Sequence, residues 1–431
     1  MEKLMQYIWQ HRLWRPASLT AVDGRKVKLI DPGTLNTGSG PDFFNAKVMI
    51  DGHLWAGNVE IHVRASDWKR HGHHLDRAYD NVVLHVVEYD DMAVHRSDGE
   101  VIPQVIMPAA ADFSVHYSRL VARADSSLPC REEIASLPQL YVSDWIAALA
   151  HERLYAKVER IEGLLSRFSG DWREVCYVSL ARALGFGLNS EPFERLALAT
   201  PLRVLMKHSD SPLALEAMLF GQSGLLGDVP QGRRDRYVES LLREYGFMQS
   251  KFGLKPIGSE CWRTGRMRPH NLPHRRIALL AAFVAEIHGL FAGLTSASGI
   301  DEVRSVLNTS LSGYWTSHFT LGGQEATTTS ALSRASLDVM VINVAVPLVY
   351  AYGLYKGDDS ACTRAVDMLC GLGAESNSVV AMFRDAGVRC CDAFTSQALI
   401  QLRRAYCEPR KCLYCRIGHR MLSRHAVRTN Q

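Results

Sequence analysis

The sequence predicts a chain of two parts, an α/β domain at the N-terminus followed by a large all-helical region. Three observations predict this α+β organisation. Up to about Pro108, short apolar runs are broken by turn-forming residues, which is typical of strands joined by tight turns. From about Leu137 onward, long amphipathic stretches dominate, and glycines and prolines mark the breaks between them. A length of 431 residues also exceeds one ordinary hydrophobic core, so two or three domains are expected.

The N-terminal domain is expected to run helix, strand, strand, strand, helix, strand (αβββαβ). Residues 3–14 place apolar side chains at helical spacing, and the polar stretch 66–79 is helix-like with Ser66 available as its cap. Asp51-Gly52 separates two strand-like runs and is a strong hairpin signal. The strand-like runs are 26–30, 43–50, 53–63 and 81–89.

The remainder is expected to be helical. The stretches with helical periodicity are 140–168, 172–184, 191–206, 211–220, 232–248, 274–294, 331–354, 360–371 and 392–405. We therefore divide the chain into an α/β domain at 1–108, a linker at 109–136, a helical domain at 137–390 and a basic C-terminal segment at 391–431.

Composition and charge exclude several classes of protein. A hydrophobic content of 47% and a charged content of 22% are those of a soluble globular protein. The net charge of +4 is mild, so only local basic patches could argue for nucleic acid. The N-terminus lacks the apolar run of a signal peptide, and nothing approaches the roughly 18 consecutive apolar residues of a membrane span. We expect a cytoplasmic protein with no membrane partner and mostly reduced cysteines, and no feature sets its oligomeric state.

Two carboxylates stand where a sheet usually has apolar side chains. Side chains alternate along a strand, so Glu60 and His62 are expected on one face of 53–63, opposite its apolar residues. Asp42 begins the neighbouring strand, so its carboxylate could meet Glu60 across the hairpin. Two carboxylates that close remain ionised together only around a cation, and their oxygen atoms suit Mg²⁺ or Mn²⁺. The alternative is that Asp42 is a turn residue after Pro41 and that Glu60 lies on a solvated face.

The pattern Pro41-Asp42 and Glu60-Ile61-His62, within the order αβββαβ, resembles the core of the PD-(D/E)XK nuclease superfamily. The resemblance implies that Asp42 and Glu60 bind a divalent metal, with the carbonyl of Ile61 as a further ligand. His62 stands where the superfamily has a lysine that helps to activate the attacking water. This is a departure, because a histidine is about half protonated near its reference pKa of roughly 6.5. His62 could act as a general base or a softer metal ligand, or it could mark an inactive relative.

A second resemblance covers almost the whole chain. The runs GPDFFNAKV, GNVEIHV and SDWKRHGHHLDRAYDNVVLHVV, with CLYCRIGH near the end, resemble the bacterial family called domain of unknown function 2851. This resemblance brings no established activity with it. It implies that the two parts of the chain belong together as one architecture.

The polar stretch after the acidic strand is rich in histidine. His71 is expected on one helical stripe with Tyr79, from which it could approach the two acids and act with them. The alternative is that His71 faces solvent, as we expect of His73 and His74.

A rival interpretation takes His62, His71 and His85 as a zinc site. His85 is flanked by apolar residues and is otherwise expected to be a core or cleft-edge residue. The zinc interpretation is weaker because no pair of these histidines has the HExxH spacing of helical zinc ligands.

Three cysteines cluster near the C-terminus. Cys407, Cys412 and Cys415 fall in C-x4-C-x2-C, and such a turn can bring thiolates within about 4 Å of one another around one metal ion. His419 or Cys391 could complete four ligands. The expected occupant is Zn²⁺, and the alternatives are buried or free thiols and an iron–sulfur cluster. The cluster is an alternative because some members of the superfamily that the chain resembles carry one near the C-terminus, but the spacing of these cysteines is not diagnostic of it.

Two stretches are basic. Residues 403–428 hold eight Lys or Arg against one acid. Trp262 stands beside Arg263, Arg266 and Arg268, and guanidinium groups suit phosphates while an indole can stack on a base. The alternative is that both are a solvated loop and tail.

Two classes of function therefore remain. The first is a metal-dependent phosphodiester hydrolase acting on nucleic acid, with Asp42 and Glu60 at the metal and His62 near the water. The alternative is a catalytically inactive nuclease fold that serves as a nucleic-acid-binding or scaffold module. Retention of both acids favours the first, and the missing lysine favours the second.

Overall fold

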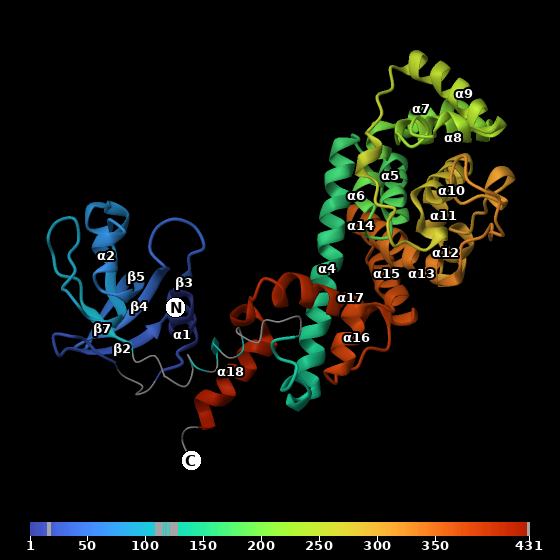
Figure 1. Cartoon of the computed structure of the whole chain (residues 1–431). Coiled ribbons are helices and arrows are strands. Elements are labelled where there is room, and N and C mark those ends of the chain that lie inside the picture. Colours follow the sequence, from blue (N-terminus) through green and yellow to red (C-terminus); the bar gives the residue numbers. More distant parts are fainter. Residues whose placement is uncertain (15–18, 108–114, 116, 119, 121–127, 429–431) are drawn as a thin grey trace. The chain divides into compact units, whose positions relative to one another are not determined.

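The computed structural model describes residues 1–14, 19–107, 115, 117, 118, 120 and 128–428 (Figure 1). Its described part forms two compact units, each assembled from separate stretches of chain. The first unit contains 1–145, 381–388 and 402–431, and the second contains 146–380 and 389–401. A mixed sheet lies in the first unit and helices make up the second, so the predicted α+β class is confirmed. Most of the predicted linker at 109–136 lies outside the described residues.

The sheet has its strands in the order β1-β2-β4-β5-β6-β7, with the short β3 paired to β4. Strands β2, β4 and β5 form an antiparallel meander, and β6 and β7 then add in parallel. The strands are β1 Leu19–Thr20, β2 Lys26–Asp31, β3 Thr34–Leu35, β4 Phe43–Ile50, β5 His53–Arg64, β6 Val82–Tyr89 and β7 Gln104–Ile106. The four long strands were predicted, whereas β1, β3 and β7 are too short to show a period in the sequence.

The hairpin between β4 and β5 turns at Asp51-Gly52, as predicted. Both residues have positive φ, 47° and 83°, which matches the type I′ turn that follows the twist of paired strands. This turn sets the register, so Phe43 pairs with Val59 at the far end of the hairpin. The register therefore places Asp42, the residue before β4, next to Glu60, the residue after Val59.

Helix α1 (Glu2–His11) packs against β5 through one apolar face. Its buried residues are Leu4, Met5, Tyr7, Ile8 and Trp9. The indole of Trp9 donates to the carbonyl of Pro32 at 3.1 Å, which ties the helix to the sheet. The polar side of α1 is left facing the acids of β4 and β5.

The stretch 66–79 is not one helix, contrary to our expectation. Helix α2 (Asp67–Arg70) ends after one turn, because Gly72 takes a left-handed φ of 80°. Two short 3₁₀ turns follow, His73–Leu75 and Arg77–Tyr79. Ser66 also makes no cap and instead bonds Asp91. His71 and Tyr79 therefore do not share a helical stripe.

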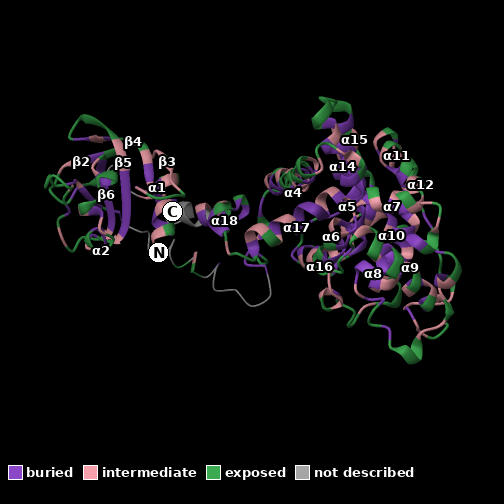
Figure 2. Cartoon of the chain, turned by 90° about the horizontal axis from the view of Figure 1, so that it is seen from above, coloured by how far each residue is buried: buried purple, intermediate pink, exposed green. Residues whose placement is uncertain are grey.

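The helical part holds one large core, and Figure 2 shows much of it buried. In the sheet, β6 is buried over most of its length. The helices are α4 Gln139–Arg167, α5 Trp172–Leu184, α6 Ser190–Ala199, α7 Leu202–Leu205, α8 Pro212–Gln222, α9 Arg236–Phe252, α10 Pro273–Ala285, α11 Leu290–Ser296, α12 Ile300–Val306, α13 Arg334–Met340, α14 Val346–Lys356, α15 Asp359–Gly371, α16 Ser378–Asp385, α17 Ala393–Gln401 and α18 Arg416–Arg428. Helix α18 belongs to the first unit.

Three of the long predicted helices are interrupted. Pro201 separates α6 from α7, because the residue before a proline disfavours the helical conformation. A short π-helix, Val341–Ala345, precedes Pro347. Its wider turn accommodates the proline, which has no N–H to donate to the preceding turn. Helices α10 and α11 bend by 68° at the break between them.

Among the described residues, one continuous helix, Arg334–Lys356, is long and apolar enough to cross a membrane. The bent pair α10–α11 passes the same test when taken together. Most of the apolar window in Arg334–Lys356 is buried inside the protein, which is typical of a core helix. Our expectation that no stretch approaches that length was therefore wrong, because residues 339–355 contain no charged residue.

Candidate functional site

The hairpin brings Asp42 and Glu60 into direct contact on neighbouring strands. The backbone N–H of Asp42 donates to Oε2 of Glu60 at 2.9 Å, and the N–H of Ile61 donates to Oδ2 of Asp42 at 3.0 Å. From α1, the amide of Gln6 donates to Oδ1 of Asp42 at 2.8 Å. Both oxygens of Asp42 are thus held by N–H donors, while Oε1 of Glu60 points away from these contacts.

Both acids lie where solvent has little access. Glu60 is 4% exposed and Asp42 is partly buried. Burial, and then the negative charge of Glu60, raises the pKa of Asp42, and burial likewise raises the pKa of Glu60. Two carboxyl groups in this situation retain a proton between them unless a cation neutralises their charge. The alternative of a solvated Glu60 is wrong.

His62 is fully buried and held by a chain of hydrogen bonds that starts at Gln104. The amide nitrogen of Gln104 donates to Oδ1 of Asp90 at 2.9 Å and to the carbonyl of Met92 at 3.0 Å, which orients its oxygen. That oxygen lies 2.8 Å from Nδ1 of His85, so this nitrogen carries the proton. Nε2 of His85 then accepts from Nδ1 of His62 at 2.9 Å. The remaining nitrogen of His62, Nε2, therefore presents a lone pair.

This lone pair faces the acid and a second histidine. Nε2 of His62 lies 3.5 Å from Oε1 of Glu60 and 3.1 Å from Nδ1 of His71. Burial, and then the neighbouring histidines, lowers the pKa of His62 to about 2, and burial lowers the pKa of His85 to about 4. Both rings are neutral at pH 7. The roles of general base and of softer metal ligand both use such a lone pair, and they stay predictions for His62.

A trio of histidines gathers beside Glu60. One ring nitrogen from each of His62, His71 and His73 lies within 4.8 Å of the other two. Nε2 of His73 lies 3.3 Å from Oε1 of Glu60, and its ring stacks on Tyr79 with a centroid distance of 3.8 Å. His73 is 9% exposed, so our expectation that it faces solvent was wrong. His71 is exposed and forms the open side of the cluster.

This geometry corrects the zinc site of His62, His71 and His85 that the sequence suggested as a rival interpretation. His85 lies behind His62, with both its ring nitrogens already engaged. His73 takes the place that we had given to His85. The pattern His71-Gly72-His73 was the available signal, because the left-handed Gly72 turns both histidines toward β5.

The trio forms a donor set of three imidazole nitrogens, and Oε1 of Glu60 lies beside two of its members, His62 and His73. Neutral imidazole suits Mn²⁺, Zn²⁺ and other transition metals, whereas Mg²⁺ prefers oxygen ligands alone. The hydrogen bond from His62 to His85 is the kind that orients a metal-binding imidazole and fixes its tautomer. Such a site can bind an ion and present it, past His71, to a solvent-borne ligand.

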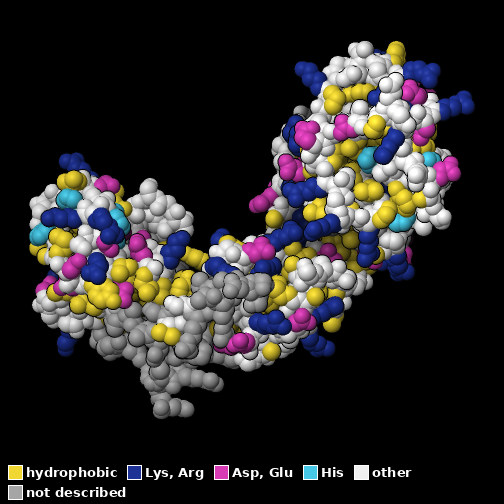
Figure 3. Space-filling view, in the orientation of Figure 1, with side chains coloured by type: hydrophobic (Ala, Val, Ile, Leu, Met, Phe, Trp, Pro, Cys, Tyr) yellow, Lys and Arg dark blue, Asp and Glu magenta, His cyan; other side chains and the backbone are white. Residues whose placement is uncertain are grey.

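The basic stretch near Trp262 does not offer a base-stacking surface. Trp262 is 7% exposed, packs edge-on against Phe193 and donates its indole N–H to the carbonyl of Ser223. The side chains of Arg263, Arg266 and Arg268 are exposed in the second unit, whereas Asp42 and Glu60 belong to the first. Figure 3 shows Lys and Arg side chains interspersed with acidic ones on the face in view.

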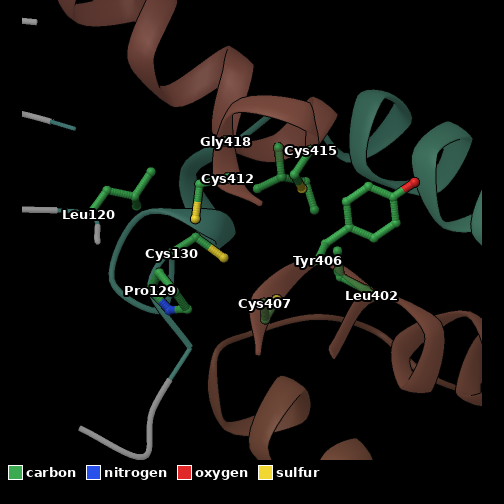
Figure 4. Close-up of a pocket in the computed structure, with 10 residues that line it drawn as sticks. Leu120, Pro129, Cys130, Leu402, Tyr406, Cys407, Cys412, Cys415 and Gly418 are labelled. Atoms are coloured by element: carbon green, nitrogen blue, oxygen red, sulfur yellow. The ribbon is translucent and has the colours of Figure 1, made fainter. Parts of the chain in front are cut away.

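The predicted cysteines Cys407, Cys412 and Cys415 line one small pocket (Figure 4). Within the described residues, the histidine trio is the one group of three or more ligands whose atoms all lie within 4.8 Å of one another. The expected approach of the three sulfurs to about 4 Å is therefore absent.

Neither proposed fourth ligand lies in that pocket. The ring of His419 is hydrogen-bonded to the hydroxyl of Tyr7 and to Ser423. Cys391 is exposed and belongs to the second unit. The fourth cysteine of the pocket is instead Cys130, which the sequence analysis did not consider.

Comparison with known proteins yields one match. The model of a family described as "Protein of unknown function (DUF2851)" matches residues 2–378, which include both acids and all three clustered histidines. No curated protein and no solved structure matches the chain.

Proposed function

The chain belongs to this family of proteins of unknown function (DUF2851), and we propose that its first unit is a metal-dependent phosphodiester hydrolase. The observation that carries the proposal is the contact of Asp42 and Glu60 across β4 and β5, beside a trio of histidines. The element order supports a core like that of PD-(D/E)XK nucleases, because α1 precedes an antiparallel meander and β6 returns in parallel beside β5.

The donor set fits a metal ion with an affinity for nitrogen. Glu60, His62, His71 and His73 would hold it, and Mn²⁺ or Zn²⁺ suits them better than Mg²⁺. A bound ion would polarise the phosphodiester and lower the pKa of a water molecule that attacks phosphorus. Asp42 donates its N–H to Glu60 and thereby fixes the orientation of that carboxylate.

His62 would not serve as a proton-carrying substitute for lysine. It is neutral, and its Nδ1 proton is committed to His85, so the ring offers a lone pair and no positive charge. His71 is the exposed member of the cluster and is the first that a substrate would reach. In this proposal His62 binds the ion and His71 contacts the substrate.

One observation favours the second candidate, a nuclease fold that binds nucleic acid or acts as a scaffold without catalysis. Both oxygens of Asp42 already accept N–H bonds, so Asp42 is poorly placed as a metal ligand. Nucleic acid remains the proposed partner in either case, with the exposed Arg263, Arg266 and Arg268 as phosphate contacts. The cytoplasm remains the proposed location, since none of the ten cysteines, all of which lie in the described part of the chain, forms a disulfide.

The test is cleavage of single- and double-stranded DNA and RNA by the full chain with Mg²⁺, Mn²⁺ or Zn²⁺. We expect cleavage with Mn²⁺ or Zn²⁺, and a loss of about 100-fold or more in Glu60→Gln. Asp98→Asn, an exposed acid in a turn of the same unit, is the matched control.

Two outcomes decide between the candidates. Binding of nucleic acid without cleavage by any metal-loaded form supports the scaffold. Cleavage that survives both chelation and Glu60→Gln removes the basis for a hydrolase at this site.

A further inference from the structure

A small pocket in the first unit is lined by four of the ten cysteines. Cys130 comes from the loop before α4, Cys407 from the π-helix Leu402–Cys407, and Cys412 and Cys415 from the turn that leads into α18 (Figure 4). The cavity between them has a volume of about 20 Å³, and the rest of its wall is apolar apart from Tyr406. Three separate segments thus place four sulfur-bearing side chains around one space.

The backbone at Cys412 and Cys415 is built for close packing. A 3₁₀ turn, Cys412–Tyr414, joins the two residues, and Cys415 immediately precedes α18. Gly418 lies so close to the turn that a Cβ there would sit 2.2 Å from the carbonyl oxygen of Cys412.

As thiols without a metal, the four residues contribute little stability by lying close together. All four thiols are buried, and apart from Tyr406 the rest of the pocket wall is apolar. A bound cation would stabilise the four as thiolates, because it neutralises the mutual repulsion of their buried negative charges.

We propose that Cys130, Cys407, Cys412 and Cys415 form a four-thiolate metal centre in the first unit. Four thiolates are a complete coordination set both for tetrahedral zinc and for an iron–sulfur cluster. Binding releases the thiol protons to solvent, since the metal takes the sulfur lone pairs. The centre ties the chain before α4 to the C-terminal segment, and its existence does not depend on the proposed hydrolase activity.

The distance between the sulfurs differs between the two kinds of metal centre, a single zinc ion and an iron–sulfur cluster. Single zinc ions bound at about 2.3 Å hold their sulfurs about 3.8 Å apart, so here the thiols would have to close inward. A cluster, having its own width, is held by thiolates that stand further apart. Both occupants use the same four ligands, and elemental analysis tells them apart.

The test begins with the full chain purified without oxygen, with zinc, iron and acid-labile sulfide measured per chain. We expect about one zinc, or iron with matching sulfide and visible colour. Cys130→Ser should lose the metal as completely as Cys412→Ser, whereas Cys391→Ser, an exposed thiol in the second unit, should keep it. Full metal content in Cys130→Ser would overturn the assignment of the fourth ligand.

A second measurement uses the unsubstituted protein, so that misfolding of a variant cannot decide the result. Alkylation mapped by mass spectrometry should leave the four pocket cysteines unlabelled until a chelator removes the metal. Cys370 and Cys391 are exposed and should react in both states. Metal-free protein as isolated, or labelling of the four thiols that is unchanged by chelation, would overturn the proposal.

Discussion

At the scale of single residues, His73 shows how far three neighbouring histidines can differ. His71 is exposed, His73 is 9% exposed and stacked on Tyr79, and His74 is intermediate. The difference arises because Gly72 breaks the helix, so successive side chains no longer follow a helical stripe. His73 is the member of this group that meets Glu60.

We predict that His73→Ala lowers the affinity of the first unit for Mn²⁺ or Zn²⁺ by about tenfold or more, because it removes one of four proposed donors. Isothermal titration with each ion measures the effect. His53→Ala, an exposed residue at the start of the same strand β5, should leave the affinity unchanged. Equal affinity in His73→Ala and the native chain would show that this histidine only packs against Tyr79.

The sequence predicted part of this site and missed the rest for a physical reason. Asp42 and Glu60 were found because one tight turn fixes the register of their hairpin, and turn chemistry is local. The hydrogen bonds of His85 to His62 and Gln104 could not be predicted, because they depend on the parallel pairing of β5, β6 and β7. Cys130 lies far from the other three cysteines in the chain, so its spacing carries no signal.

At the scale of elements, the turn before α18 depends on one glycine. A Cβ at Gly418 would lie 2.2 Å from the carbonyl oxygen of Cys412, which is backbone and cannot rotate away. We predict that Gly418→Ala lowers the free energy of unfolding by about 1–3 kcal/mol through overpacking and reduces the metal content at the four cysteines. Denaturant unfolding and elemental analysis measure these effects.

A second glycine provides the control. Gly246 lies on the exposed side of α9, and nothing would lie within 4 Å of a Cβ there. Gly246→Ala should raise the free energy of unfolding by up to about 1 kcal/mol, since alanine favours a helix. If Gly418→Ala behaved like Gly246→Ala, the turn at Cys412 would have to be more pliable than its contacts indicate.

A buried lysine links three helical elements of the second unit. Nζ of Lys157 on α4 donates to the carbonyl of Ile342 and the side chain of Asn343 in the π-helix, and to Gln397 on α17. Burial, followed by the positive charge of Arg153, lowers the pKa of Lys157 to about 7. The free chain titrates near 10.4, so the unfolded state binds more protons between these values.

This difference predicts a pH dependence of stability. Because the unfolded state holds the extra proton, the contribution of Lys157 to the free energy of unfolding rises with pH from about 7 to about 10. Relative to Lys157→Met, the native chain should gain about 2 kcal/mol between pH 7 and pH 9. Denaturant titrations at several pH values measure it, with the exposed Lys207→Met as control. A native-to-variant difference that stays flat over this window would mean that Lys157 keeps its proton in the folded state.

Element prediction succeeded where periodicity was long and failed where backbone chemistry intervened. Helix α5 and strand β4 have the predicted bounds, because a single apolar period runs through each of them. The stretch 191–206 broke at Pro201, and 331–354 acquired a π-helix before Pro347, since proline removes a backbone donor. Helix α16 was not predicted, and its eight residues give too short a period to identify.

At the scale of the whole molecule, neither compact unit is a continuous stretch of chain. The first unit gathers the sheet, the loop at Cys130 and the C-terminal residues 402–431, although the whole helical core lies between them in the sequence. Amphipathic patterns report which face of an element is buried but not which distant segment covers it. The division at residues 108 and 391 could not anticipate this assembly.

The discontinuous first unit predicts that its N-terminal part depends on the end of the chain. On α1, Tyr7 is hydrogen-bonded to His419, and the ring of His11 lies 4.7 Å from the same imidazole. Helix α1 also carries Gln6, which holds Asp42. Loss of the C-terminal segment should therefore loosen α1 and, through it, the acid pair.

A variant that ends at Gln401 should exchange the backbone hydrogens of α1 faster than the full chain, whereas one that ends at Arg428 should not. Hydrogen exchange with mass spectrometry measures the difference peptide by peptide. Cys412→Ser separates two causes, because it removes a proposed metal ligand but keeps His419. If it leaves α1 protected, the contact of Tyr7 with His419 carries the effect; if it loosens α1 as much as truncation does, the metal centre carries it. Unchanged exchange in the variant ending at Gln401 would show that α1 and the sheet hold together without the C-terminal segment.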